Sequence, residues 1–241
     1  MRTIGLIGGM SWESSALYYQ WVNEGVKERL GGLHSAEVVM YSVDFAGIEL
    51  LQHEGRWEEA AERLVEVAKK VERGGADFLV LCTNTMHKVA SAITTAVEIP
   101  LLHIADATAD RIKPNGIRRV GLLGTRFTME QGFYKGRLAD EHGLEVLVPD
   151  EEDRHLVHDI IYDELCLGKV RDASRKEYRR IMAGLVERGA EAIILGCTEI
   201  TMLVTQEDAA VPLFDTTAIH AQKAVEIALE EDKALAIRGK V

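Results

Sequence analysis

Two side chains that could move a proton stand just after two short apolar runs. Thr83 follows Phe78–Cys82, and Cys197 comes shortly after Ala192–Leu195. Apolar runs of this length predict buried strands, and ligands of open parallel sheets bind beyond the carboxyl ends of the strands. A thiol and a hydroxyl on opposite sides of one carbon atom could take a proton from one face and return a proton to the other. The pair therefore predicts a site for inversion of a stereocentre.

The pairing of Thr83 with Cys197 follows from an internal repeat. Gly75–Thr83 matches Gly189–Cys197 without a gap, 114 residues further along, and each copy is preceded by the tripeptide Val-Glu-Arg. Two further matches occur in the same order, at offsets of 116 and 112: Gly5–Gly8 with Gly121–Gly124, and Pro100–Leu102 with Pro212–Phe214. Repeats that keep order and spacing indicate two copies of one structural unit. Thr83 and Cys197 are thus equivalent positions, which we expect to face each other across a cleft.

Apolar runs alternate along the chain with charged, helix-periodic stretches such as Trp57–Arg73 and Arg171–Arg188. The expected strands are Ile4–Ile7, Val38–Ser42, Phe78–Cys82, Leu101–Ile104, Val120–Leu123, Val146–Val148, Ala192–Leu195 and Leu213–Phe214. This alternation predicts an α/β protein with two pseudo-symmetric, flavodoxin-like parallel-sheet domains and the site in the cleft between them.

The first domain is expected to comprise residues 1–104 and 215–241, and the second residues 105–214. No long linker rich in serine, glycine or proline separates the two halves. A last helix, over about Thr216–Ile237, follows the final strand and is expected to pack back on the first half.

The residues beside the pair have distinct expected roles. Cys82 precedes Thr83 on a strand, where side chains alternate, so it is expected to point into the interior. Cys197 precedes a turn into a helix, whose N-terminus is expected to lower the pKa of the thiol towards neutrality. Asn84, Thr85 and Thr198 offer polar groups that could bind a carboxylate at two helix starts.

Composition excludes several partners. The formal net charge of −11 over 241 residues opposes binding to nucleic acid or to an anionic membrane. Three widely spaced cysteines without a CxxC pair predict reduced thiols and a cytoplasmic location. The N-terminal apolar run breaks at glycines and is too short for a signal segment or a membrane span.

Several motifs together resemble the cofactor-independent aspartate/glutamate racemase family. They are Gly8–Ser14, Ser42–Phe45, Thr83–His87, Gly124–Thr125 and Gly196–Glu199. The resemblance implies a two-domain enzyme, a homodimer, that inverts a small-molecule amino acid with no metal, pyridoxal phosphate or other cofactor. It also implies that Cys197 is the acid/base that serves the L-enantiomer. The substrate contacts that it implies are Met10, Gln52, Asn84, Thr85, Thr125 and Thr198.

The chain departs from the family pattern at Thr83, where the pattern has its first cysteine. Because free enantiomers have equal energy, a weak base at this position cannot make the enzyme one-way. It can slow both directions, or leave exchange of one enantiomer's α-proton without inversion. Family members that act on acidic amino acids carry a basic side chain near two places, where this chain has Gln52, Cys166 and Lys169. Amino acids with neutral side chains therefore stay open as substrates.

Other interpretations stay open at this point. A dinucleotide site at Gly5–Gly9 is the disfavoured alternative, because the segment lacks the glycine spacing of such a site. His155 and His158 could bind a metal, but a solvated acidic helix start after Asp150 is favoured. His87 is expected to cap or pack near the site, with a direct role as the alternative. Maleate isomerase, hydantoin racemase or arylmalonate decarboxylase activity would use the same cysteine, and an amino-acid-binding protein without turnover is the alternative from another class.

Overall fold

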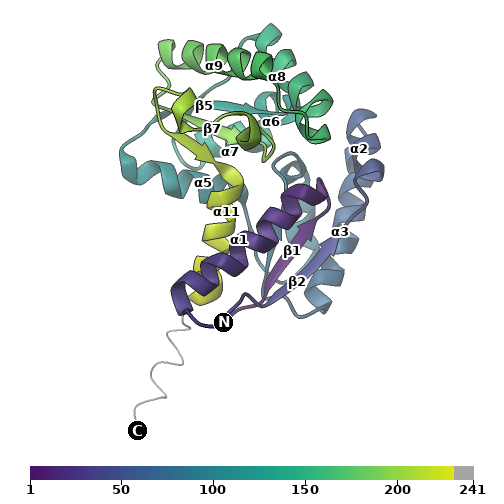
Figure 1. Ribbon diagram of the computed structural model, residues 1–241. Helices are drawn as coiled ribbons and strands as arrows, with labels where there is room; N and C mark the ends of the chain where they lie inside the picture. The colour runs from purple at the N-terminus through teal and green to yellow at the C-terminus, as the bar shows by residue number, and fades with distance from the viewer. Residues whose placement is uncertain (231–241) are drawn as a thin grey trace. The chain divides into compact units, whose positions relative to one another are not determined.

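The computed structural model describes residues 1–230 (Figure 1), and its first sheet has four parallel strands in the order β2-β1-β3-β4. These strands are β1 (Ile4–Gly8), β2 (Val38–Ser42), β3 (Phe78–Leu81) and β4 (Leu101–Leu102). The connecting helices are α1 (Trp12–Leu30), α2 (Phe45–His53), α3 (Trp57–Arg73), η1 (Thr85–Val89) and α4 (Ala90–Ala96).

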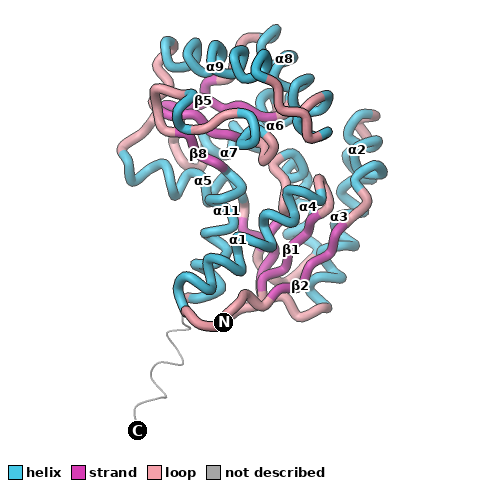
Figure 2. The backbone as a smooth tube through the Cα atoms, in the orientation of Figure 1, coloured by secondary structure: helices cyan, strands magenta, loops and turns pink. Residues whose placement is uncertain are grey.

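The second sheet repeats this topology with the order β6-β5-β7-β8. Its strands are β5 (Arg119–Gly124), β6 (Glu145–Leu147), β7 (Ala192–Gly196) and β8 (Leu213–Asp215). Its helices are α5 (Ile104–Ile112), η2 (Lys113–Asn115), α6 (Arg126–Glu130), α7 (Gly132–Asp140), α8 (Glu151–Asp163), η3 (Leu165–Leu167), α9 (Asp172–Glu187), α10 (Ile200–Leu203), η4 (Gln206–Asp208) and α11 (Thr216–Leu229). The expected α/β class with two parallel sheets is confirmed, and Figure 2 shows the strands of each sheet among their helices.

Glycines of β1 show how helices cover the first sheet. A Cβ atom at Gly5 would lie 2.7 Å from a methyl group of Val71 in α3, and one at Gly8 would lie 2.5 Å from the Ser15 hydroxyl in α1. Positions three apart on a strand point to opposite faces. Helices α1 and α3 therefore cover opposite faces of β1 and approach too closely for any side chain there.

Equivalent glycines of β5 do the same in the second sheet. A Cβ atom at Gly121 would lie 3.0 Å from Leu185 of α9, and one at Gly124 would lie 3.3 Å from Thr128 of α6. With helices on both faces, the strands β1 and β7 are buried along their whole length, as is usual for parallel sheets. The apolar runs of the sequence are thus explained by burial on both faces.

The repeat also holds at the start of the third strand of each sheet. Gly75 and Gly189 both have positive φ angles, +92° and +95°, which only glycine adopts without strain. The Leu79 N–H donates to the Pro100 carbonyl at 2.8 Å, and the equivalent Ile193 N–H donates to the Pro212 carbonyl at 2.9 Å. The internal match read from the sequence therefore corresponds to two copies of one backbone arrangement.

Several expected strands differ from the observed strands by one residue at an end, and the largest difference is at β4. The strand expected over Leu101–Ile104 stops at Leu102 because the His103 side chain accepts a hydrogen bond from the Ala105 N–H at 3.2 Å and so caps α5. The last helix begins at Thr216 as expected and is described to Leu229; the part of the expected helix after residue 230 lies outside the described residues.

The chain packs into two compact units. The first comprises residues 1–80, 91–102 and the described residues from Ala221, and the second comprises residues 81–90 and 103–220. The segment that carries Thr83 thus belongs to the same unit as Cys197, although it follows a strand of the first sheet. The division at residues 104 and 214 stays a prediction, and residues 231–241, assigned by it to the first domain, lie outside the described residues.

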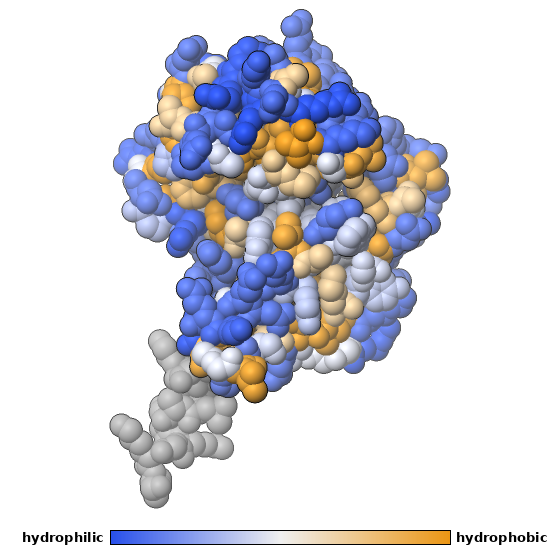
Figure 3. All heavy atoms as spheres, viewed as in Figure 1, coloured by the Kyte–Doolittle hydropathy of each residue, from blue (hydrophilic) through white to orange (hydrophobic). Residues whose placement is uncertain are grey.

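The second unit has one continuous apolar core beneath a charged surface. Its core includes Val120 and Leu122 of β5, Ile193 of β7 and Tyr178 of α9, all nearly inaccessible to solvent. The surface over α8 and α9 is mostly hydrophilic in the space-filling view (Figure 3). None of the helices within residues 1–230 has the length and apolar character required to cross a membrane.

Candidate active site

Thr83 and Cys197 both retain exposure among buried neighbours. Each is only partly buried, whereas the residues on either side, such as Asn84 and Thr198, are at most 8% exposed. The Thr83 N–H donates to the Leu81 carbonyl at 2.8 Å, while its hydroxyl makes no hydrogen bond within residues 1–230. The hydroxyl is therefore available to a ligand.

Cys82 cannot act as a base at this strand end. Its side chain is fully buried, as the alternation along the strand predicts. Burial raises the pKa of the Cys82 thiol far above its ordinary value, so the thiolate does not form near neutral pH. Of the two adjacent side chains, Thr83 is partly exposed and Cys82 is not.

Cys197 has a carboxylate partner that the sequence interpretation did not assign. The thiol donates a hydrogen bond to Oε2 of Glu199 at 2.9 Å. Desolvation first, and then the negative charge of Glu199, raise the pKa of Cys197 well above its ordinary value, while the backbone N–H of Glu199 acts weakly in the other direction. Glu199 is thus placed to receive the thiol proton.

The expectation of a lowered pKa at Cys197 is wrong for this structure. The helix that follows, α10, has only four residues, so few aligned peptide dipoles act on the sulfur. Glu199 is the N-cap residue of that helix and lies within hydrogen-bond distance of the sulfur, and its charge opposes formation of the thiolate. Desolvation and this nearby carboxylate together outweigh the helix.

Threonine side chains join the segment after β3 to the end of β5. The hydroxyls of Thr85 and Thr125 are 3.0 Å apart, and Thr125 also lies 3.2 Å from the Thr128 hydroxyl. Thr125 is the N-cap of α6 and accepts from the Thr128 N–H at 3.4 Å. Two predicted substrate contacts, Thr85 and Thr125, are therefore brought into direct contact.

Asn84 is held by a residue from the other end of the chain. Its amide donates to the Thr216 hydroxyl at 3.0 Å, and that hydroxyl donates to the Leu195 carbonyl at 2.9 Å. The amide oxygen of Asn84 is buried and has no partner within the described chain. A buried acceptor without a donor costs about 1–3 kcal/mol. It therefore indicates a place where a ligand N–H would be favoured.

Thr198 is joined to the same C-terminal segment. Its hydroxyl lies 2.7 Å from that of Thr217, and Asp215 accepts the Thr217 N–H at 2.9 Å to begin α11. The sequence interpretation did not identify Thr216, Thr217 or Glu199 as site residues. A signal was present, because three polar residues from Asp215 to Thr217 directly follow strand β8, where ligands of parallel sheets bind.

Met10 and Gln52 belong to the first unit, whereas the other six predicted site residues belong to the second. Met10 follows β1 and is 6% exposed, and Gln52 lies near the end of α2 and is 3% exposed. The loop after β1 is fixed by Ser15, whose hydroxyl accepts from the Gly9 N–H at 2.7 Å. Their role as substrate contacts stays a prediction.

The acidic start of α8 is confirmed. Asp150 is the N-cap and accepts from the Asp153 N–H at 3.0 Å, with three acidic residues in the first turn. His158 accepts the Arg126 N–H through Nδ1 at 3.3 Å, so this ring supports the start of α6. Within residues 1–230, neither His158 nor His155 belongs to a cluster that could hold a metal ion.

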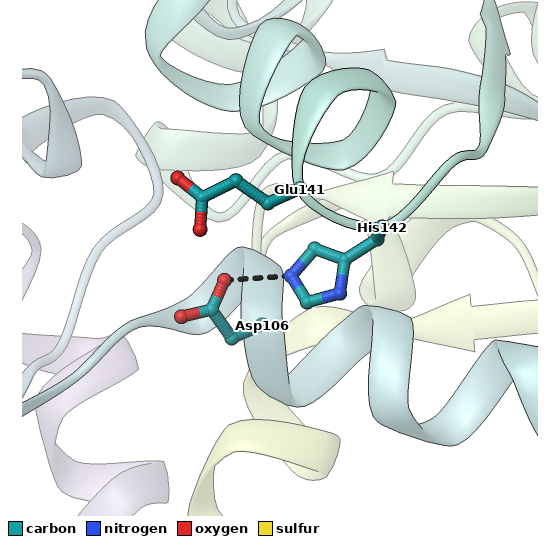
Figure 4. A group of neighbouring side chains, drawn as sticks. All are labelled: Asp106, Glu141 and His142. Atoms are coloured by element: carbon teal, nitrogen blue, oxygen red, sulfur yellow. Dashed lines mark hydrogen bonds and ion pairs between the residues drawn. The ribbon is translucent and has the colours of Figure 1, made fainter.

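One cluster in the second unit has metal-ligand chemistry but already contains a cation. Asp106, Glu141 and His142 bring their ligand atoms within 4.8 Å of one another (Figure 4). Arg137 donates to both oxygens of Asp106, at 2.6 and 2.8 Å, and pairs with Glu141 at 3.0 Å. His142 lies 2.8 Å from the same Asp106 carboxylate. The guanidinium stands where an ion would bind, so the cluster is best described as an ion-pair network.

Comparison with known proteins places this arrangement in a family. The sequence profile of the Asp/Glu/Hydantoin racemases matches residues 7–224, which include every predicted site residue. The chain belongs to the Asp/Glu/Hydantoin racemase family. Membership makes it an enzyme of the isomerase type, and it confirms the resemblance read from the motifs.

Relatives of this racemase-family chain match it over most of its length. The crystal structure of a candidate Asp/Glu racemase from Yersinia pestis has 57% identity and a TM-score of 0.91, and covers 95% of this chain and 100% of that one. An aspartate racemase homologue from Pyrococcus horikoshii OT3 has 36% identity and a TM-score of 0.82, with 95% and 99% covered. The broad-specificity amino-acid racemase RacX of Bacillus subtilis (strain 168) has 23% identity over 231 residues, 92% of this chain and 96% of RacX.

Proposed function

We propose that the protein racemises free amino acids by two-sided proton transfer between Cys197 and Thr83. The observation that carries the proposal is the pair of partly exposed groups that follow equivalent strands, the thiol with a carboxylate partner and the hydroxyl with none within residues 1–230. Membership of a racemase family supports it. No cofactor is assigned a step, because the two side chains account for both proton transfers.

The proton transfers balance when Glu199 and water are included. The Cys197 thiolate takes the α-proton of the L-enantiomer, and the Thr83 hydroxyl donates its proton to the opposite face of the planar carbanion. The product has the inverted configuration, Cys197 is then a thiol and Thr83 an alkoxide. The cycle closes when the proton that Glu199 took from the Cys197 thiol at the start returns through water to the basic Thr83 alkoxide, which is partly exposed.

The remaining predicted contacts are proposed to orient the substrate. The buried amide oxygen of Asn84 can accept a hydrogen bond from the substrate ammonium group. The hydroxyls of Thr85, Thr125 and Thr198 can donate to the α-carboxylate. Met10 and Gln52 of the first unit are proposed as further contacts, on the family resemblance alone.

We also propose that the enzyme accepts a range of side chains. RacX, a relative over almost the whole chain, is a broad-specificity amino-acid racemase. Cys166 is close enough to influence the pKa of Cys197, and Lys169 three residues later is exposed. A cysteine, unlike a lysine or an arginine, offers no fixed cation for the distal carboxylate of an acidic amino acid, which supports a range that includes neutral side chains. The homodimer and the cytoplasmic location stay predictions.

Incubation of both enantiomers of a panel of amino acids in deuterated water tests the proposal. The panel contains acidic, neutral polar and apolar side chains, with chiral chromatography for inversion and proton NMR for exchange at the α-carbon. We expect either enantiomer of an accepted amino acid to end as the same racemic mixture, with deuterium at the α-carbon. Thermal stabilisation by an amino acid without exchange or inversion would contradict the proposal and favour a binding protein.

Glu199→Gln is expected to move the pH dependence of kcat/KM to lower pH. Proton abstraction requires the thiolate, so kcat/KM rises with pH as Cys197 titrates. The charge of Glu199 raises the pKa of that thiol, and a neutral glutamine removes the charge. The rising limb should therefore shift towards acid.

The matched control is Glu207→Gln, which removes one negative charge from an exposed position of the same unit. Its profile should coincide with that of the wild type. An unshifted limb in Glu199→Gln would show that the carboxylate does not act on Cys197.

A further inference from the structure

His87 uses both ring nitrogens to join two segments of the second unit. Its Nδ1 lies 2.7 Å from the Thr83 carbonyl oxygen, and its Nε2 lies 3.2 Å from the backbone nitrogen of Ile104. The side chain is 2% exposed. A carbonyl only accepts and a backbone N–H only donates, so Nδ1 carries the proton and Nε2 is the acceptor. The hydrogen-bond geometry thus selects one neutral tautomer.

The surroundings of His87 keep that tautomer neutral. Burial lowers the pKa of His87 well below its ordinary value, and the neighbouring His103 acts in the same direction. The ring centroids of His103 and His220 lie 4.5 and 5.8 Å away, while Asp106 raises the pKa and Arg137 lowers it. Protonation would also set an N–H of the ring against the Ile104 N–H. His87 therefore stays neutral near neutral pH, and its one N–H is used in the bond to the Thr83 carbonyl.

The hydrogen bond from His87 holds the second of the two main-chain polar groups of Thr83. The Thr83 N–H is held by the Leu81 carbonyl at 2.8 Å, and its carbonyl is held by the ring. Both main-chain polar groups of Thr83 are then used, while its hydroxyl makes no hydrogen bond within residues 1–230. The direction of that hydroxyl depends on the backbone that the ring holds.

We infer that His87 is a positioning residue for Thr83: its ring ties the Thr83 carbonyl to the first turn of α5 and so aims the Thr83 hydroxyl. The inference rests on the proposed racemase function. It predicts that loss of the bond to Thr83 impairs proton transfer on the Thr83 face alone, and leaves the Cys197 face intact.

Two amide variants separate the two bonds of the ring. In His87→Asn the side-chain amide reaches the position of Nδ1 and can donate to the Thr83 carbonyl, but nothing accepts the Ile104 N–H. In His87→Gln the amide oxygen reaches the position of Nε2 and can accept the Ile104 N–H, but the bond to Thr83 is lost. Each variant loses one buried hydrogen bond, so similar falls in Tm are expected.

The measurements are the racemisation rate, which needs both faces, and the deuterium exchange of the L-enantiomer, which needs Cys197 alone. We expect racemisation to be slower in His87→Gln than in His87→Asn by about ten-fold or more, because small misplacements of a reacting group cost up to about a hundred-fold. Exchange of the L-enantiomer should stay near the wild-type rate in both variants.

Equal racemisation rates in the two variants, or an equal loss of racemisation and of L-enantiomer exchange, would overturn the inference. A wild-type enzyme without exchange would instead overturn the proposed function on which it rests. Nitrogen-15 NMR of the His87 ring checks the geometry independently of activity: Nδ1 should carry the proton and Nε2 should not. The opposite tautomer would remove the bond to Thr83 and with it the inference.

Discussion

Replacing Cys197 with alanine is expected to lower racemisation in both directions by about 10²–10⁴-fold, the usual contribution of a general acid or base. The thiol is partly exposed at the end of β7 and donates a hydrogen bond to Glu199, so its removal takes away the proposed proton carrier of that face. Because the free enantiomers have equal energy, kcat/KM must fall by the same factor from either side. Deuterium exchange of the L-enantiomer should be lost together with inversion.

Cys82→Ala is the matched control for this result. It removes a thiol of the same kind from the end of the equivalent strand of the first sheet, but one that is fully buried and whose raised pKa keeps it protonated. Rates should stay close to those of the wild type, with a loss of stability from the cavity that is typical of a buried deletion. Activity lost in Cys82→Ala and kept in Cys197→Ala would reverse the assignment.

Most helices and strands of this fold can be predicted from the sequence, because the local hydrophobic period and the internal repeat indicate the same elements. The helix expected over Trp57–Arg73 begins and ends at those residues in the structure, since its apolar positions recur with a strict helical period. The third strands of the two sheets start at Phe78 and Ala192, at the offset of the repeat. The largest difference at a strand end is at β4, because His103 caps a helix, a role that its residue type does not indicate.

The sequence predicts the site residues that directly follow strands, but it does not predict the partners that these residues contact. Thr83 and Cys197 are identified by the repeat, and Thr85 and Thr125 prove to be in contact. The partner of Asn84, in contrast, is Thr216, which lies 132 residues away in sequence, and no local pattern joins them.

The pKa of Cys197 could not be read from the sequence for a related reason. It depends on how deeply the sulfur is desolvated and on where the Glu199 carboxylate points, and both are set by tertiary packing. The helix dipole that favours a low pKa is visible as a sequence pattern, whereas the opposing effects are not.

Replacing Thr83 with valine is expected to abolish inversion while leaving proton exchange on the other face. Valine keeps the branched shape and removes the hydroxyl, and the partly exposed position should tolerate it. Racemisation should fall by about 10²-fold or more, because the carbanion then has no donor on that face. The L-enantiomer should still exchange its α-proton for deuterium through Cys197, since the thiol returns the label to the face from which it took the proton.

Thr83→Ser is the matched control, because it restores the hydroxyl on a smaller side chain and should recover most of the inversion. A Thr83→Val enzyme that racemises like the wild type would show that water or another group reprotonates this face. Equal loss of inversion and exchange would instead mean that Thr83 shapes the whole site. Only retained exchange without inversion supports Thr83 as the second proton carrier, since that outcome requires one working face and one disabled face in the same folded enzyme.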